Sequence, residues 1–186
     1  MVKYGIVFVI FFAIIVSINA TCVVQGICGS QRNHVCLPAN IGYLKATKKV
    51  HKLCPKYPTG SNVCCNDDQI KMLEKGLHEG RRWFGGKCYK LMRDLFCHMH
   101  CSPDQDSFLS GVTTDHEKVT SFTVNVTQPE VNNLWNACKD KTFLFVRLVT
   151  KVCINRPCDA KEFLRSIGTS RSRGGKSPFQ INFNFV

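Results

Sequence analysis

Two pairs of cysteines have the spacing that most constrains the chemistry of this chain. Cys64 and Cys65 are neighbours, and adjacent residues reach disulfide geometry only with strain, so we expect their sulfur atoms to bond two different partners. Cys97 and Cys101 are four residues apart and therefore share one face of a helix. We expect at least one disulfide from the doublet to this face. It would clamp a helix that begins near Asp67 against the helix that carries Cys97 and Cys101.

Residues 1–20 are typical of a secretory signal peptide rather than of a folded element. Lys3 supplies a positive charge, an apolar run follows from Ile6 to Val16, and Ala20 gives a small residue at the cleavage site. The apolar run is shorter than the ~20 residues of a membrane span, and no other stretch is long enough. We expect a soluble, monomeric product of residues 21–186 that is secreted or lies in the lumen of the endomembrane system.

All twelve cysteines follow the signal peptide, and their even number predicts six disulfides formed in an oxidising compartment. A metal site is the alternative, because residues 97–101 read Cys-His-Met-His-Cys. Zinc sites usually show two spaced pairs of ligands, and cysteines of secreted proteins are normally oxidised, so we expect no metal. The same compartment permits glycosylation, which is predicted at Asn125 in the sequon Asn-Val-Thr.

The residue pattern does not match that of an enzyme. Secreted phospholipases have a histidine after a cysteine doublet, but Asp68 occupies that position here, and no glycine-rich calcium loop precedes it. Four histidines lack a nucleophile and a paired acid at a recognisable spacing. They are His78, His98, His100 and His116. Without a phosphate-binding glycine loop or a HExxH motif, we predict that the protein is not an enzyme and needs no cofactor.

The charge balance favours anionic partners. Removal of the signal peptide takes one lysine and no acid, which lowers the formal net charge from +12 to +11. Such a charge suits acidic membrane surfaces and acidic partners. The cations are scattered except for Arg171, Arg173 and Lys176 in a segment rich in Gly and Ser, and we predict no nucleic-acid partner. The segment is either a linker or a lip that docks on membranes.

Apolar periodicity predicts two central helices. Asp67 and Asp68 suit the start of a helix, and we expect Gly80 and Gly85–Gly86 to break it. Its apolar stripe consists of Ile70, Leu73 and Leu77. A second helix stops before Pro103. Its apolar face carries Leu91, Met92, Leu95, Phe96 and Met99.

The second half of the chain adds strands and shorter helices. Residues 121–127 and 179–185 alternate apolar and polar, as half-buried strands do. We expect helices over residues 129–138 and 160–167. Residues 143–152 are apolar and fit either a helix or a strand, and their length favours a helix. A flexible basic loop is expected over residues 168–177. The fold class is therefore α+β: a helix-rich, disulfide-stapled single domain with a small β-sheet.

The apolar inventory points to a binding module. The chain has 13 phenylalanines, and both helices and the terminal strand present apolar faces. These faces form either a packed core reinforced by disulfides or an apolar ligand pocket with a few placed polar groups.

Three runs of residues decide between these interpretations. They are Val63-Cys64-Cys65 followed by Gln69 and Leu73, then Leu95-Phe96-Cys97-x3-Cys101-Ser102-Pro103, then Asn136-Ala137-Cys138. Together with the other cysteines they resemble the luminal N-terminal domain of the Niemann–Pick type C1 family, over residues 22 to about 185. That domain binds cholesterol and other sterols. The resemblance implies the disulfides Cys22–Cys64, Cys28–Cys36, Cys54–Cys97, Cys65–Cys101, Cys88–Cys138 and Cys153–Cys158.

The resemblance also implies a set of sterol-binding residues. Gln69 matches a glutamine that holds the sterol hydroxyl. The matched apolar wall consists of Leu73, Tyr89, Phe96, Pro178, Phe179 and Ile181. Val35 stands where the family has a second polar anchor, an asparagine, and Asn33 lies two residues earlier as its substitute. Further pocket positions are substituted at Val24, Ile27, Lys151 and Val152. With one polar anchor instead of several, discrimination among sterols should weaken.

We therefore predict a secreted lipid-binding protein that carries, transfers or sequesters cholesterol or a related sterol, with a lipid-donor protein or an acidic membrane as partner. The chain stops at Val186 without a membrane region, so we expect the sterol-binding domain alone. The alternatives are a cysteine-rich interaction protein and a carrier of another small hydrophobic molecule. Folate and riboflavin carriers stack their ligands between Trp and Tyr rings, whereas Trp83 and Trp135 lie outside the matched pocket positions.

Overall fold

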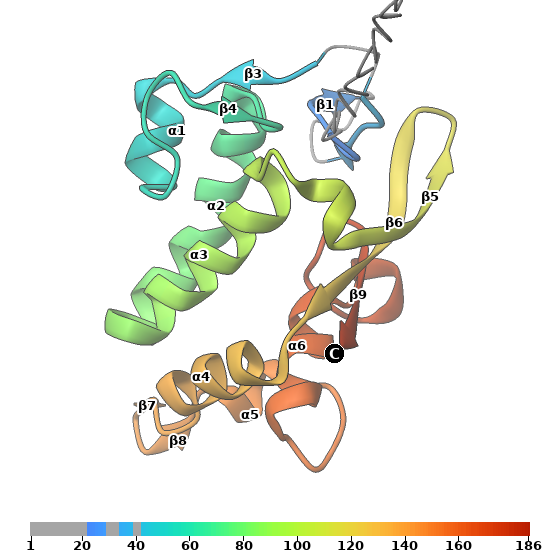
Figure 1. The fold of residues 1–186 in the computed structure, drawn as a ribbon. Helices are drawn as coiled ribbons and strands as arrows, with labels where there is room; N and C mark the ends of the chain where they lie inside the picture. The colour runs from blue at the N-terminus through green and yellow to red at the C-terminus, as the bar shows by residue number, and fades with distance from the viewer. Residues whose placement is uncertain (1–21, 29–33, 39–41) are drawn as a thin grey trace, which may run out of the picture.

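A computed structural model describes residues 22–28, 34–38 and 42–186 (Figure 1). The predicted signal peptide and Asn33 lie outside these ranges. Within them, no helix combines the length and the apolar character needed to cross a bilayer.

Two long helices, joined by a single residue, form the middle of the molecule. α2 (Asp67–Phe84) begins at a capping box in which Asn66 and Gln69 bond each other's backbone N–H groups, and α3 (Gly86–Cys101) follows. The predicted break at Gly80 is wrong, because α2 continues to Gly85, where φ is 51°. One glycine costs a helix interior only about 1 kcal/mol, whereas a left-handed φ stops the helix.

A three-stranded sheet lies against this pair (Figure 1). β5 (Leu109–Asp115) runs antiparallel to β6 (Lys118–Val126), and β9 (Gln180–Phe185) lies parallel to β6 on its other side. The alternating patterns of the last two strands are confirmed, with Phe122 and Ile181 buried side by side. β5 escaped sequence analysis because most of its residues are exposed and show no alternation. Asn125 lies on the middle strand, where its Oδ1 accepts a hydrogen bond from Asn184 at 2.9 Å.

Two of the three short helices are confirmed, and one is largely wrong. α4 (Gln128–Cys138) and α6 (Ala160–Gly168) form as expected, each with a side-chain cap. Residues 143–152 instead contain the hairpin of β7 (Thr142–Phe143) and β8 (Val146–Arg147), and only α5 (Val149–Val152) is helical. Leu144 and Phe145 form the turn of this hairpin with left-handed φ angles, which no right-handed helix accommodates.

The remaining elements are short. β1 (Ile27–Cys28) pairs with β2 (His34–Val35), β3 (Leu44–Lys45) pairs with β4 (Asn62–Val63), and α1 (Lys48–Leu53) precedes Cys54. Two 3₁₀ turns cover Gln105–Ser107 and Arg171–Arg173. A hydrogen bond closes the segment 168–177 into a loop: the N–H of Arg171 donates to the carbonyl of Ser177 at 2.9 Å.

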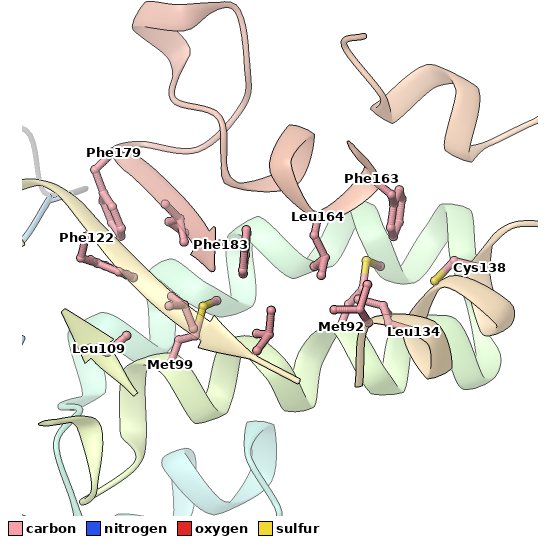
Figure 2. Packing of buried hydrophobic residues seen from close by; sticks show 14 of the residues in the cluster. Met92, Met99, Leu109, Phe122, Leu134, Cys138, Phe163, Leu164, Phe179 and Phe183 are labelled. Atoms are coloured by element: carbon pink, nitrogen blue, oxygen red, sulfur yellow. The ribbon is translucent and has the colours of Figure 1, made fainter. Parts of the chain in front are cut away.

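The apolar side chains form two clusters. The larger joins α3, α4, α6 and the sheet, and Figure 2 shows Phe122, Phe179 and Phe183 meeting Met99 across it. The smaller joins α1, α2 and α3 around buried Ile70. A helix pair with one cluster on each side is held rigidly between them.

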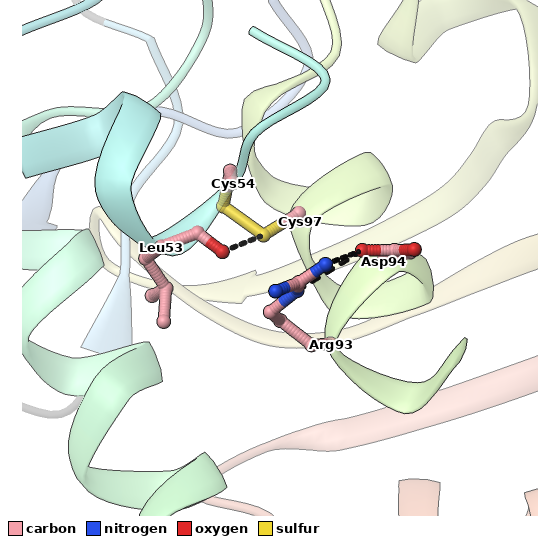
Figure 3. A network of polar contacts seen from close by, with 5 residues as sticks. All are labelled: Leu53, Cys54, Arg93, Asp94 and Cys97. Atoms are coloured by element: carbon pink, nitrogen blue, oxygen red, sulfur yellow. Dashed lines mark hydrogen bonds and ion pairs between the residues drawn. A yellow bond between two sulfur atoms is a disulfide. The ribbon is translucent and has the colours of Figure 1, made fainter. Parts of the chain in front are cut away.

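All six disulfides implied by the family resemblance are present. They are Cys22–Cys64, Cys28–Cys36, Cys54–Cys97, Cys65–Cys101, Cys88–Cys138 and Cys153–Cys158. The doublet therefore reaches two partners, and one of them lies on the predicted face of α3. Cys54–Cys97 fastens the end of α1 to the same helix, beside the Arg93–Asp94 ion pair (Figure 3).

Candidate functional site

A cavity of about 1110 Å³ lies between the helix pair and the C-terminal third of the chain. α2 and α3 form one wall, and the β7–β8 hairpin, α5, α6 and residues 174–181 form the other. Most of the lining side chains are apolar. The volume is at the upper limit of the ~300–1,000 Å³ found for small-molecule sites, so the cavity is large enough for a bulky ligand.

Two glycines of α2 create part of this space. Gly76 and Gly80 are four residues apart on the face that lines the cavity. A Cβ atom added to Gly76 would meet no atom within 4 Å, and one added to Gly80 would lie 3.5 Å from the Met92 side chain. The helix thus lacks side chains where the cavity needs room.

Half of the residues predicted to bind sterol line the cavity. They are Leu73, Phe96, Val152, Pro178, Phe179 and Ile181. They come from α2, α3, α5 and the start of β9, which are distant in sequence. The structure therefore brings together the apolar wall that the family resemblance implied, except for Tyr89.

The other predicted residues lie behind this wall or beside it. Val24 and Val35 are fully buried in the larger apolar cluster, against which Ile27 packs. Tyr89 packs against the smaller cluster on the other side of α3. Their side chains support the wall without forming its surface in this structure.

Gln69 is buried beside the cavity and carries an unused donor. Its Oε1 accepts hydrogen bonds from the N–H groups of Gly26, at 2.7 Å, and Asn66, at 3.0 Å. Two N–H donors fix that atom as the oxygen, so the other atom is the amide nitrogen. This Nε2 is buried and has no hydrogen-bond partner among the described residues. Gln69 precedes the lining residue Leu73 by one turn of α2.

His100 is a polar residue of the cavity wall that sequence analysis did not select. It is 4% exposed, and its Nδ1 has no partner within the described part of the chain. Its ring meets Phe179 edge to face, with centroids 6.3 Å apart. Burial lowers the pKa of His100 to about 4, so the imidazole is neutral at physiological pH. The sequence signal that could have identified His100 is its four-residue spacing from Phe96 and Met92, which places all three residues on one stripe of α3.

The two unused polar groups lie at the same end of the helix pair. The Cys65–Cys101 disulfide joins the start of α2 to the end of α3, with Cα atoms 4.5 Å apart. His100 precedes Cys101, and Gln69 lies in the first turn after Cys65. We call this region, made of His100, Gln69 and the Cys65–Cys101 disulfide, the inner end.

A second buried glutamine holds the N-terminal segment against the inner end. Gln105 is fully buried, and its Oε1 accepts from the N–H groups of Val23 and Val24 at 2.9 and 3.0 Å. Its Nε2 donates to the carbonyls of Met99 and His100, both at 3.0 Å. These four bonds fix the backbone that carries His100. A lone glutamine in a polar stretch gives no sequence signal for this role.

The opposite end of the cavity, which we call the mouth, has a different chemistry. It is lined by Trp83, Phe143 and Leu144, which are 42, 50 and 75% exposed. The cationic side chains of the cavity lining are Arg82, Lys151 and Lys176. No aspartate or glutamate occurs among the described lining residues. The mouth is therefore apolar and basic.

The described residues include no group of three His, Cys, Asp or Glu side chains arranged to hold a metal ion. All twelve cysteines are in disulfides, so none serves as a nucleophile or a thiolate ligand. What this site can do chemically is enclose an apolar body and offer hydrogen bonds at its inner end.

Comparisons with known proteins agree with this geometry. The family described as Niemann-Pick C1 N terminus matches residues 19–186. The chain is 27% identical over 143 residues to NPC intracellular cholesterol transporter 1 homolog 1 of Caenorhabditis elegans, a match covering 67% of this chain and 10% of that protein. It is 31% identical over 104 residues to NPC intracellular cholesterol transporter 1 of Sus scrofa, covering 49% of this chain and 8% of that protein.

The match thus spans about a tenth of the length of these relatives. Within this chain, however, the family match takes in every cysteine and both walls of the cavity. The chain belongs to the Niemann-Pick C1 N-terminal domain family.

Proposed function

We propose that the protein binds cholesterol or a related sterol in the cavity, with the sterol hydroxyl at the inner end and the tail toward the mouth. The observation that carries this proposal is the unpartnered Nδ1 of buried His100 in the wall of a mostly apolar cavity. The relatives named as cholesterol transporters support a sterol as the ligand.

The polar groups of the inner end favour a hydroxylated lipid over a hydrocarbon. A buried polar atom without a partner costs about 1–3 kcal/mol. The Gln69 amide nitrogen can only donate, and a neutral imidazole donates through one nitrogen and accepts through the other. A hydroxyl both donates and accepts, so it can serve either group.

The cellular role that follows is to bind a lipid without chemically changing it. A protein of this kind carries, transfers or sequesters its lipid in an oxidising compartment, secreted or luminal, where six disulfides persist. The alternative of an interaction protein requires that the cavity stay empty, and the alternative of another cargo requires a different preferred ligand.

A fluorescent sterol titrated into the disulfide-intact protein tests this function. Saturable one-to-one binding is expected. Gly76→Leu places a side chain in the cavity and should weaken binding at least about tenfold, since the space is filled while helix propensity improves. Gly76→Ala is the matched control and should bind like the wild type.

Two results would contradict the proposal. One is a correctly oxidised, folded protein that does not bind sterol, which would favour the interaction protein. The other is equal sterol affinity for Gly76→Leu and Gly76→Ala, which would place the sterol outside the cavity.

A further inference from the structure

The β7–β8 hairpin exposes an apolar tip beside the mouth. Phe145 is fully exposed at 101%, and Leu144 is 75% exposed. Phe143 and Trp83, which meet edge to face with centroids 4.8 Å apart, form the base of the tip. Soluble domains rarely expose adjacent large apolar side chains, and such patches mark interaction sites.

The backbone holds these side chains out in solvent. Thr142 pairs with Arg147 and Phe143 with Val146, so the turn contains only Leu144 and Phe145. Both have left-handed backbone angles, with φ of 47° and 68°. Asn and Gly are the usual residues of such a turn, and bulky residues there are uncommon. Two bulky apolar residues thus occupy a strained turn without gaining burial.

Cations flank the apolar tip along the chain. The segment from residue 139 to residue 151 holds four cationic side chains and one acidic one. The cations are Lys139, Lys141, Arg147 and Lys151. None of them forms an ion pair with another described residue. Arg82, on α2, lies against the Trp83 ring at 5.9 Å. Apolar and aromatic side chains flanked by cations without ion pairs match the interface of a bilayer that contains anionic lipids.

We propose that the β7–β8 hairpin docks the protein on membranes that contain anionic phospholipids. Phe145 and Leu144 enter the interfacial region, and Arg147 and Lys151 contact the lipid headgroups. A protein partner fits less well, because four side chains at a hairpin tip offer far less than the ~800 Å² that each side of a standard interface buries. The protruding tip suits a deformable surface, and the excess of positive charge does not suit a second copy of the same chain.

Docking in this way places the mouth of the cavity on the membrane. Leu144 and Lys151 belong to both the hairpin region and the cavity lining. A lipid therefore reaches the cavity from the bilayer without crossing water. The docking itself does not depend on the proposed sterol binding; only the direction of lipid movement does.

Co-sedimentation of the full disulfide-intact chain with phosphatidylcholine vesicles, with and without phosphatidylserine, tests the docking. We expect binding to the phosphatidylserine vesicles that weakens about tenfold for Phe145→Gly and also falls for Arg147→Ser. Glycine suits the left-handed turn position, so Phe145→Gly keeps the fold. Phe145→Trp should restore binding, because Trp favours the bilayer interface. Higher salt should weaken binding of the wild type.

The controls change the same residue types elsewhere. Leu37→Ser removes an exposed leucine, and Lys52→Ser removes an exposed cation of α1, at the opposite end of the molecule from the hairpin (Figure 1). Both should bind vesicles like the wild type. Equal vesicle binding by Phe145→Gly and the wild type would overturn the proposal. So would light scattering that shows a dimer which Phe145→Gly abolishes, since the hairpin would then bind a second copy.

A sterol titration in solution separates this proposal from the proposed function. Phe145 and Arg147 do not line the cavity, so their variants should bind sterol like the wild type while losing vesicles. Vesicle binding that requires Phe145 in a protein without sterol affinity would refute sterol binding and support docking.

Discussion

The inner end and the mouth of the cavity are built in opposite ways. Three disulfides converge on the elements of the inner end: Cys22–Cys64, Cys65–Cys101 and Cys54–Cys97. Buried glutamines bond the N-terminal backbone to it. The mouth has short elements and exposed apolar side chains. Cys88–Cys138 fastens the start of α3 to the end of α4 beside it, and Cys153–Cys158 closes a separation of only five residues. One end is buried and cross-linked on several sides, whereas the other exposes apolar side chains to solvent.

This difference has a physical reason. A hydrogen bond discriminates between ligands only when donor and acceptor are held in place and shielded from water, which covalent cross-links and buried amides provide. Entry of a bulky lipid requires apolar surface to be exposed for part of the time, which a rigid, sealed mouth would prevent. In the function that we propose, the inner end therefore selects the ligand and the mouth admits it.

Removing a disulfide at each end gives the largest expected effect. Cys65→Ser/Cys101→Ser opens a 36-residue separation and should lower the free energy of unfolding by about 4 kcal/mol in the chain-entropy account. Cys153→Ser/Cys158→Ser opens a five-residue separation and should cost about 2 kcal/mol. Urea denaturation of both variants measures the difference. A larger loss at the mouth would contradict the contrast between the two ends.

The pH dependence of stability reports on the inner end. Burial lowers the pKa of His100 from 6.5 to about 4, so between these values the unfolded chain binds more protons than the folded one. Stability is therefore lost as the pH falls through this window, by roughly 2 kcal/mol between pH 7 and pH 5. His100→Gln should remove this part of the loss in denaturation experiments at both pH values.

Burial also lowers the pKa of His98, which contributes a loss of the same sign. The loss of stability that arises from His98 should persist in His100→Gln and disappear in His98→Gln. An unchanged pH slope in His100→Gln would show that His100 is not buried as the structure has it.

The strained turn at the mouth predicts a gain in stability. Leu144→Asn/Phe145→Gly introduces the preferred residues of a two-residue hairpin turn. Relief of two left-handed positions should raise the free energy of unfolding by about 1–2 kcal/mol, since little buried surface is lost. Thermal unfolding by circular dichroism measures the shift. A loss of stability would show that the tip packs against the domain.

The smallest expected effect concerns the helix between the two ends. Gly76→Ala adds a Cβ that meets no atom within 4 Å, so it should stabilise α2 by up to about 1 kcal/mol. The melting temperature should rise. A decrease would show that residue 76 does not face open space.

The cysteine pattern made the inner end predictable from the sequence. Adjacent cysteines bond each other only with strain, and the four-residue spacing of Cys97 and Cys101 places both on one helix face. Residue spacing therefore predicts a disulfide from the doublet to that face, beside Gln69. His100 was missed because its polar type says nothing of burial. His100 lies on the apolar stripe of α3 that begins at Met92. The sequence does not distinguish a buried histidine on such a stripe from a histidine at the edge of an apolar face.

The mouth was much less predictable. The apolar run from Phe143 to Val152 fits a helix by length, but a two-residue turn with left-handed φ at Leu144 and Phe145 overrides it. The conformational preferences of leucine and phenylalanine do not predict this turn, because neither residue usually adopts a left-handed φ. Gly80 misled in the opposite direction: a glycine placed to leave space in a cavity has the same sequence signature as a helix break.

The affinities of a sterol and its 3-deoxy analogue for the wild type and His100→Leu test the account most directly. The wild type should prefer the hydroxylated sterol about tenfold or more, because a buried hydrogen bond is at stake. His100→Leu should lose most of this preference while binding the 3-deoxy analogue with unchanged affinity. Gln69→Ala should lose the remainder. An undiminished preference in both variants would mean that the hydroxyl does not lie at the inner end.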